Sequence, residues 1–290
     1  MSDRATPVSQ GGESDFFEAL LDFESGISPA MRDLYLAQWR EPSIEYWKVD
    51  NENRLLRTST DGSGSKERIG YDEYFRRLGL PTSRSGLSLE ALKRMRYAAT
   101  NPWGFVGFQF GEALLTDLGH YSPSTRLIVD RSGRATAAPI MYVGGLPDQT
   151  WAGGRHEVLW QEEIDAPAII ATSTNTWRGA FTGLDGANSF SDLQRPDIQT
   201  RIMVRAVAHS RRRITQSLDD TGLTWALALS RASETLREPI TISGCLAAAH
   251  LCGAEAAGRY LIQQRTTADE AGTTLESYLL RFSGYEVEQD

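Results

Sequence analysis

The sequence predicts a mainly α (α+β) fold, that is, a mostly helical protein with two small β excursions. Apolar residues recur with helical spacing along much of the 290-residue chain, and capping residues stand at the starts of several of these segments. Two short stretches instead alternate apolar and polar residues, which predicts β-hairpins. The sequence contains no internal repeat and no low-complexity tract, so a repeat architecture is not expected.

The first helix is expected over residues 16–24. Asp15 is a suitable N-cap with Glu18 at N3, as in a capping box. Gly26 suits the C′ position, so the helix should end at Ser25 and Gly26. Further helices are expected over 71–78, 88–99 with Ser88 as N-cap, 109–118, 155–165, 190–214, 219–236, 242–263 with an interruption at Gly253, and 273–282.

Two hairpins are expected between these helices. Residues 44–58 alternate around Asn51–Asn53, and residues 127–129 can pair with 140–143. The Gly- and Ser-rich residues 60–65 are typical of a loop.

The charge of the chain argues against nucleic acid as a partner. The net charge at pH 7 is −8 and the pI is about 5.2, and an acidic surface repels phosphates. It also repels anionic cell-wall polymers at long range. A local basic segment can offset that repulsion; it contains Arg201, Arg205, Arg211, Arg212 and Arg213.

The sequence predicts neither a membrane span nor a secretory signal. No apolar run reaches the roughly 18 residues that a transmembrane helix needs, and residues 1–13 have no apolar core of a signal peptide. Localisation is otherwise open. If the target is the cell wall or periplasm, we expect delivery by another system, such as a phage tail, a lysis system, an injection apparatus or nonclassical secretion.

The two cysteines predict neither a disulfide nor a metal site. Cys245 and Cys252 lie seven positions apart in a helical segment, so their Cα atoms should be roughly 10 Å apart, too far for a disulfide. No Cys or His with ligand spacing accompanies them. No metal and no cofactor is expected.

Glu24 is the candidate catalytic residue. It stands at the C-terminal end of the first amphipathic helix, after Phe23, where it faces the negative end of the helix dipole. If apolar neighbours also desolvate it, its pKa should rise. A protonated carboxyl group can then donate a proton to a glycosidic oxygen near neutral pH. The alternative is a solvated glutamate at a helix end with no catalytic role.

Two further segments carry candidate binding residues. In the glycine-rich segment 104–111, Gly107 permits close backbone approach, and Gln109 offers donors and acceptors to a sugar acetamido group or a carboxylate. Tight helix packing is the alternative explanation for these glycines. In segment 247–255, His250 is a candidate acid or base, or a histidine that only packs.

Taken in order, these segments resemble the lysozyme-like superfamily, especially lytic transglycosylases and phage-associated muramidases. In that family a Glu-Ser pair ends the first core helix, a Gly-x-x-Gly-x-Gln segment follows, and an Ala-Ala-Tyr-Asn-x-Gly segment comes later. The corresponding residues here are Glu24-Ser25, 104–109 and 248–253. A Trp-x-Gly, Thr-Gly and Gly element of the phage-type branch is similar to Trp177-x-Gly179, Thr182-Gly183 and Gly186.

The resemblance implies a domain organisation. It implies a flexible tail over 1–14, a lysozyme-like helical domain with inserted β-hairpins over 15–263, and a C-terminal helix and tail over 264–290. The distance from Glu24 to Gly104 is longer than in the family, so residues of about 30–95 would be an insertion, such as a lid or a wall-binding excursion. A second insertion is expected at about 122–160. The family's Tyr-Asn is His250-Leu251 here, a departure that affects the sugar-contacting role of this segment.

The resemblance also implies a reaction and a partner. Glu24 would protonate the leaving oxygen between N-acetylmuramic acid and N-acetylglucosamine in peptidoglycan glycan strands, by hydrolysis or with an anhydro product. Ser25, Gly107, Gln109, Trp177 and His250 would bind substrate. A two-carboxylate mechanism needs a second acid, for which the candidates are Glu112, Asp117 and Asp185. Candidates for stacking on sugar faces are Trp103, Phe108, Trp177, His250 and Tyr260.

Two other functions remain open from the sequence. One is an inactive lysozyme-like wall-binding or structural module in a phage tail or contractile injection particle, whose proteins would then be its partners. The other is a cytoplasmic helical regulatory protein, which would not bind the wall at all.

Overall fold

The structure is a computed structural model that describes residues 9–48, 56, 65–80, 82–129, 133–142, 157–159, 169–172, 174–268 and 273–288. Within them the fold is mixed α+β and mainly helical, as the sequence predicts. The chain divides into two compact units: unit 1 is Met1–Leu20 with Thr200–Asp290, and unit 2 is Leu21–Gln199. Their limits do not coincide with the boundaries expected at residues 14 and 263.

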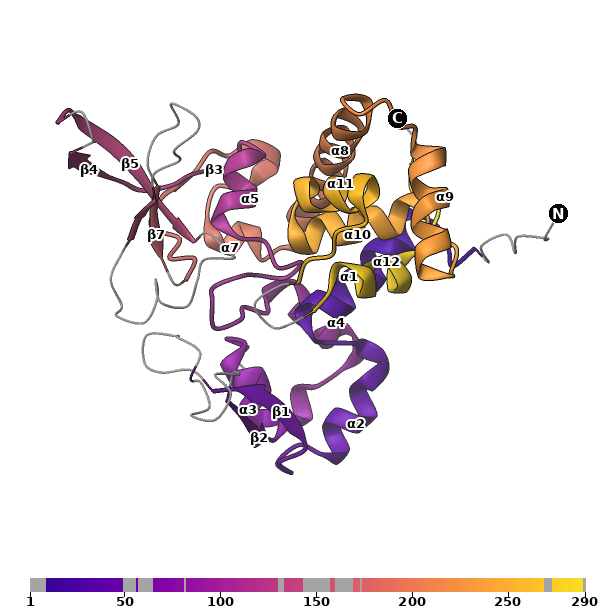
Figure 1. Cartoon of the computed structure of the whole chain (residues 1–290). Helices are drawn as coiled ribbons and strands as arrows, with labels where there is room; N and C mark the ends of the chain where they lie inside the picture. Colours follow the sequence, from indigo (N-terminus) through magenta and orange to yellow (C-terminus); the bar gives the residue numbers. More distant parts are fainter. Residues whose placement is uncertain are drawn as a thin grey trace. The chain divides into compact units, whose positions relative to one another are not determined.

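Unit 1 is built from helices. It contains the first part of α1 (Glu13–Ser25), most of α8 (Pro196–Asp219), α9 (Trp225–Leu236), α10 (Ile242–Cys252), α11 (Ala254–Gln263) and α12 (Leu275–Phe282). Helices α10 and α12 pack closely, because Gly244 of α10 has no side chain and so allows the Leu279 carbonyl of α12 to approach. The C-terminal helix is therefore part of this core, together with α10 and α11 (Figure 1).

The start of α1 joins the same core. Phe16 is fully buried and its ring meets that of Phe282 edge to face, with 6.3 Å between centroids. Helix α1 begins at Glu13, earlier than expected, so Gly12 precedes it and Asp15 occupies N3. The Gly12 amide donates to the Asp15 carboxylate at 3.0 Å. Asp15 therefore makes the N3-to-N-cap contact of a capping box rather than acting as the N-cap, and Gly12 has no side chain to return the second contact.

Unit 2 begins with the second part of α1 and continues through a helical and hairpin segment. Its elements are η1 (Pro29–Met31), α2 (Arg32–Ala37), β1 (Ile44–Trp47), β2 (Lys66–Ile69), α3 (Tyr71–Arg77), η2 (Arg84–Gly86) and α4 (Leu89–Ala98). Tyr35, Phe75, Leu92 and Ala99 form one buried cluster with Ile27, which follows α1 directly. The region of about 30–95 thus has a hydrophobic core that includes Ile27 from the turn after α1.

The rest of unit 2 holds the larger sheet. It comprises α5 (Glu112–Asp117), β3 (Tyr121–Ser122), β4 (Thr125–Val129), β5 (Ala135–Tyr142), β6 (Glu157–Leu159), β7 (Ile169–Thr172), β8 (Ala180–Phe181), η3 (Leu184–Gly186) and α7 (Phe190–Leu193). The strand order β4-β5-β7-β6 combines antiparallel pairs with a parallel β5–β7 pair. Strands β4, β5 and β7 of this sheet are labelled in Figure 1. A two-stranded sheet joins β3 to β8.

The helices predicted over 71–78 and 88–99 are confirmed, and Ser88 caps α4 by accepting from the Ala91 amide. The interruption at Gly253 is also confirmed, because Gly253 separates α10 from α11. Cys245 is a buried free thiol, as expected. Burial raises the pKa of the Cys245 thiol to about 12.

Several predicted elements were wrong in partner or type. Strand β1 pairs with β2, which joins 44–47 to 66–69. Of the predicted partner stretch 54–58 only Leu56 is described, and its amide donates to the Lys48 carbonyl at 2.8 Å. Strand β4 pairs with 135–139, and 140–142 pair with β7. Residues 157–159 form strand β6, not a helix. Strand pairing depends on distant neighbours, so local periodicity does not determine it. Residues 49–55 and 57–64 lie outside the described part of the chain.

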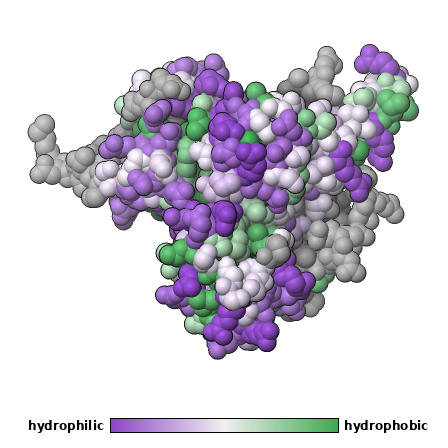
Figure 2. Space-filling model, turned by 180° about the vertical axis from the view of Figure 1, so that it is seen from behind, coloured by the Kyte–Doolittle hydropathy of each residue, from purple (hydrophilic) through white to green (hydrophobic). Residues whose placement is uncertain are grey.

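The surface is mostly hydrophilic on the face shown in Figure 2, where hydrophobic colour occurs in separate patches. Exposed large apolar residues include Met31, Leu89, Val204 and Leu280, and scattered residues of this kind are normal on a folded surface. No helix among the described residues is long and apolar enough to cross a bilayer.

Candidate active site

The candidate acid lies at the end of α1, within unit 2. Glu24 is half-buried in the last turn of the helix, and Ser25 is buried beside it. Gly26 adopts a left-handed φ of +66° and donates its amide to the Phe23 carbonyl at 3.3 Å. The Ser25 hydroxyl accepts from the Ile27 amide at 3.2 Å. The predicted glycine stop is therefore confirmed, and Ser25 orders the turn that follows it.

Gln109 lies at this helix end, although 85 positions separate it from Glu24 along the chain. Its amide nitrogen donates to the Glu24 main-chain carbonyl at 2.6 Å, and its amide oxygen accepts from the Asn101 side chain at 2.7 Å. The last carbonyls of a helix lack partners within the helix. Gln109 therefore caps α1 at Glu24, with its own side chain oriented by Asn101.

The position of Gln109 follows from a tight turn. Val106 and Phe110 exchange two backbone hydrogen bonds, and Gln109 between them has a φ of +61°. This turn explains why α5 begins at Glu112 and not at residue 109 as predicted. Asn101 orders the preceding loop, because its side-chain oxygen accepts from the amides of Trp103 and Phe105.

Gly107 has a packing role in this turn. It is buried with a φ of +59°, and an added Cβ would lie 2.0 Å from the side-chain oxygen of Gln199. Gln199 is fully buried and donates to the carbonyls of Tyr97 and Leu193 at 2.7 Å each. Gly107 thus brings the turn against Gln199, and the arrangement explains the glycine without a ligand.

Trp177 lies beside the glycine-rich loop, as part of a second cluster in unit 2. Its indole nitrogen donates to the Gly104 carbonyl at 2.8 Å, and its backbone amide donates to Glu112. Its ring is half-buried and stacked on Phe181, with an interplanar angle of 12°. A partly exposed tryptophan can contact a sugar ring.

Glu112 is the centre of this second cluster. The carboxyl is 1% exposed and accepts from the Trp177 amide and from the Tyr121 hydroxyl, the latter at 3.1 Å. Its backbone amide donates to the Asn175 side chain at 2.8 Å. Burial raises the pKa of Glu112, and this effect outweighs the donors from Trp177, Tyr121 and Thr176 that lower it.

The candidate second carboxylates have different surroundings. Glu112 is buried within its own cluster, and Asp185 lies 2.8 Å from Nε2 of the fully buried His120. Asp117 is exposed on α5. Sequence reasoning did not separate these three, whereas the structure assigns Glu112 and Asp185 to partners within the fold.

The remaining candidates fall into two groups. Phe108 and Tyr260 are each 1% exposed, so they are core residues and are not available to stack on a sugar. Trp103 is half-buried, and its carbonyl accepts from the Asn175 backbone and side chain. His250 is half-buried on α10 and, like Tyr260, belongs to unit 1, whereas Glu24, Gln109 and Trp177 belong to unit 2.

Sequence reasoning missed Asn101, Tyr121 and Asn175. Asn101 precedes Pro102, and an Asn in such a place commonly bonds to the backbone a few residues on. The local sequence has no signal for Tyr121 or Asn175, because both act on partners far away along the chain.

The comparisons with known proteins add no relative. No family model matches the chain, and no curated protein or solved structure matches it. No group of His, Cys, Asp and Glu suited to hold a metal ion occurs in the described part of the chain.

The burial of Glu112 predicts a pH dependence of stability. Because its pKa is raised in the folded state, the folded protein binds this proton more tightly than the unfolded chain. The stabilisation of the folded state by this proton is fully present below the ordinary glutamate pKa and is lost as pH rises through the raised value. The free energy of unfolding should fall there by up to about 1.4 kcal/mol per pH unit. Glu112→Gln should lack this loss, so its free energy of unfolding should rise relative to wild type as pH increases.

Urea unfolding of the two proteins at several pH values between about 4 and 7 measures the difference. Glu90→Gln is a matched control, because Glu90 is exposed on α4 of the same unit. A difference between Glu112→Gln and wild type that stays constant with pH would show that the buried carboxyl does not titrate as expected.

Proposed function

We propose that this chain cleaves peptidoglycan glycan strands between N-acetylmuramic acid and N-acetylglucosamine, with Glu24 as the general acid. The observation that supports it most directly is the hydrogen bond from Gln109 to the Glu24 carbonyl. It brings together two of the segments that resemble the lysozyme-like superfamily. A structure with Glu24 and Gln109 on unrelated faces would have argued against the proposal.

The surroundings of Glu24 suit a proton donor. The side chain is half-buried, so it can be partly dehydrated and still reach a substrate. The helix end itself is fixed by Gln109 and by the turn at Gly26 and Ile27. A general acid requires such fixed geometry, because small displacements reduce the rate strongly.

The surroundings of the other acidic candidates favour a mechanism with one protein carboxyl group over a two-carboxylate mechanism. Glu112 and Asp185 are held by Tyr121, Trp177 and His120, which leaves them poorly placed to activate water. The substrate's acetamido and 6-hydroxyl groups would then supply the second function, as the resemblance implies. Partly exposed Trp103 and Trp177 would contact sugar rings.

Product analysis with purified peptidoglycan tests this proposal. We expect the wild-type protein to release soluble muropeptides, identified by mass spectrometry. Ordinary reducing ends indicate hydrolysis, and products lighter by one water molecule indicate anhydro ends. Binding to sedimented peptidoglycan without any released product would overturn catalysis and favour the wall-binding module instead.

A further inference from the structure

We propose that Tyr74 is a positioning residue for Glu24, so that the long segment between α1 and the glycine-rich loop serves as a support of the active site. This inference rests on the proposed function. The Tyr74 hydroxyl donates to the Gly26 carbonyl at 2.9 Å, two residues after Glu24. Nothing in the local sequence around Tyr74 indicates this contact, which joins positions 48 apart.

The contact requires the glycine. An added Cβ on Gly26 would lie 2.1 Å from the Tyr74 hydroxyl oxygen, much closer than a van der Waals contact allows. Gly26 therefore has two functions: it adopts the left-handed conformation that ends α1, and it admits the Tyr74 hydroxyl to the backbone.

The same turn is held by a second tyrosine from this segment. The Ser28 amide donates to the Tyr35 hydroxyl at 2.9 Å, and the Ser28 hydroxyl donates to Asp22 at 2.8 Å. Asp22 pairs in turn with Arg96 of α4, whose side chain is 3% exposed. Side chains from α2 and α4 thus hold residues 22–28, the stretch that contains Glu24.

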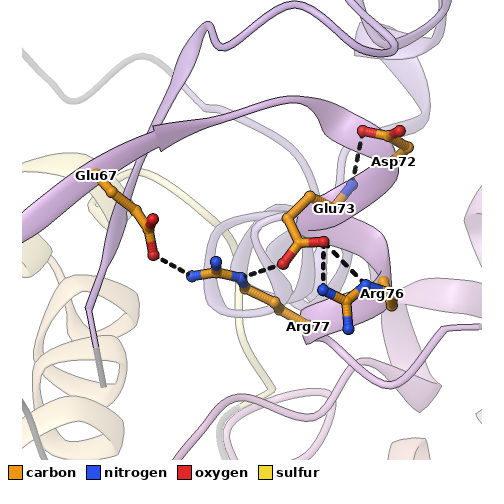
Figure 3. Close-up of polar contacts among 5 residues, drawn as sticks. All are labelled: Glu67, Asp72, Glu73, Arg76 and Arg77. Atoms are coloured by element: carbon orange, nitrogen blue, oxygen red, sulfur yellow. Dashed lines mark hydrogen bonds and ion pairs between the residues drawn. The ribbon is translucent and has the colours of Figure 1, made fainter. Parts of the chain in front are cut away.

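An ionic network orients the helix that carries Tyr74. Arg77 of α3 extends between Glu67 of β2 and Glu73 of its own helix, with nitrogen–oxygen distances of 2.8 and 2.7 Å (Figure 3). Arg76 also donates to Glu73, and these two arginines lower the pKa of Glu73. The network therefore ties α3 to the β1–β2 hairpin with charged hydrogen bonds.

Aromatic packing completes the support of Tyr74. Its ring meets those of Tyr46 and Tyr71 edge to face, with centroids 5.6 and 6.2 Å away. Burial raises the pKa of Tyr74 above its ordinary value, so the hydroxyl keeps its proton and remains a donor to Gly26 at neutral pH.

Tyr74→Phe tests the inference because it removes only the hydroxyl. Turnover of peptidoglycan should fall about tenfold in kcat while KM stays within about twofold, because the acid is displaced and substrate contacts remain. Hydrogen–deuterium exchange of residues 24–28 should quicken about fivefold, as expected for one lost hydrogen bond. Tyr71→Phe is the matched control: Tyr71 is on the same helix and packs against Tyr35 and Tyr74.

The two readouts separate the possible outcomes. Faster exchange with a lower kcat in Tyr74→Phe, and neither change in Tyr71→Phe, supports the positioning role. Unchanged exchange, or faster exchange with an unchanged kcat, overturns it. If wild-type protein shows no turnover, the proposed function fails, and the exchange comparison alone then supports or overturns the role of Tyr74 at the helix end.

Discussion

Glu24→Gln should reduce the turnover of peptidoglycan by roughly 10²–10⁴-fold, the usual contribution of a general acid. Glutamine has nearly the same size and can keep its neighbours, yet it has no acidic proton to give to the leaving oxygen. The main-chain carbonyl that Gln109 binds is unchanged by the substitution. The loss should therefore appear in kcat, with binding of the glycan retained.

The measurement compares released muropeptides and sedimentation with peptidoglycan for both proteins. Glu18→Gln is the matched control, because Glu18 is exposed on the same helix and should retain wild-type turnover. Equal turnover of Glu24→Gln and wild type would mean that another group donates the proton. Equal and negligible turnover with retained binding would indicate a wall-binding module.

Gly107→Ala should lower the free energy of unfolding by about 3 kcal/mol. The left-handed backbone at Gly107 accounts for about 1 kcal/mol of this, since alanine tolerates it poorly. The remainder comes from the new Cβ, which would approach the Gln199 amide to 2.0 Å. Gln199 is fully buried and hydrogen-bonded twice, so it has little freedom to move away.

Gly79→Ala provides the matched comparison. Gly79 has a similar φ of +72°, but nothing lies within 4 Å of the position of an added Cβ. This control should lose only about 1 kcal/mol, the conformational contribution. Thermal or urea unfolding gives both values, and equal losses at the two glycines would contradict a packing role for Gly107.

Local sequence determined the elements whose signals are local. The glycine after α1, the Ser88 cap of α4 and the interruption at Gly253 were all predictable, because each depends on conformational preferences within a few residues. The candidate acid Glu24 was also found this way, from its place at the end of an amphipathic helix.

Tertiary structure decided what depends on distant partners. Strand β5 divides its pairing between β4 and β7, and residues 157–159 became a strand because β7 offers them a partner. Gln109 looked like part of a helix, yet the turn that packs on Gln199 places it at the Glu24 carbonyl. Tyr74 reaches Gly26 across 48 positions. Such contacts arise only when packing brings separate segments together, and periodicity along one segment contains no information about them.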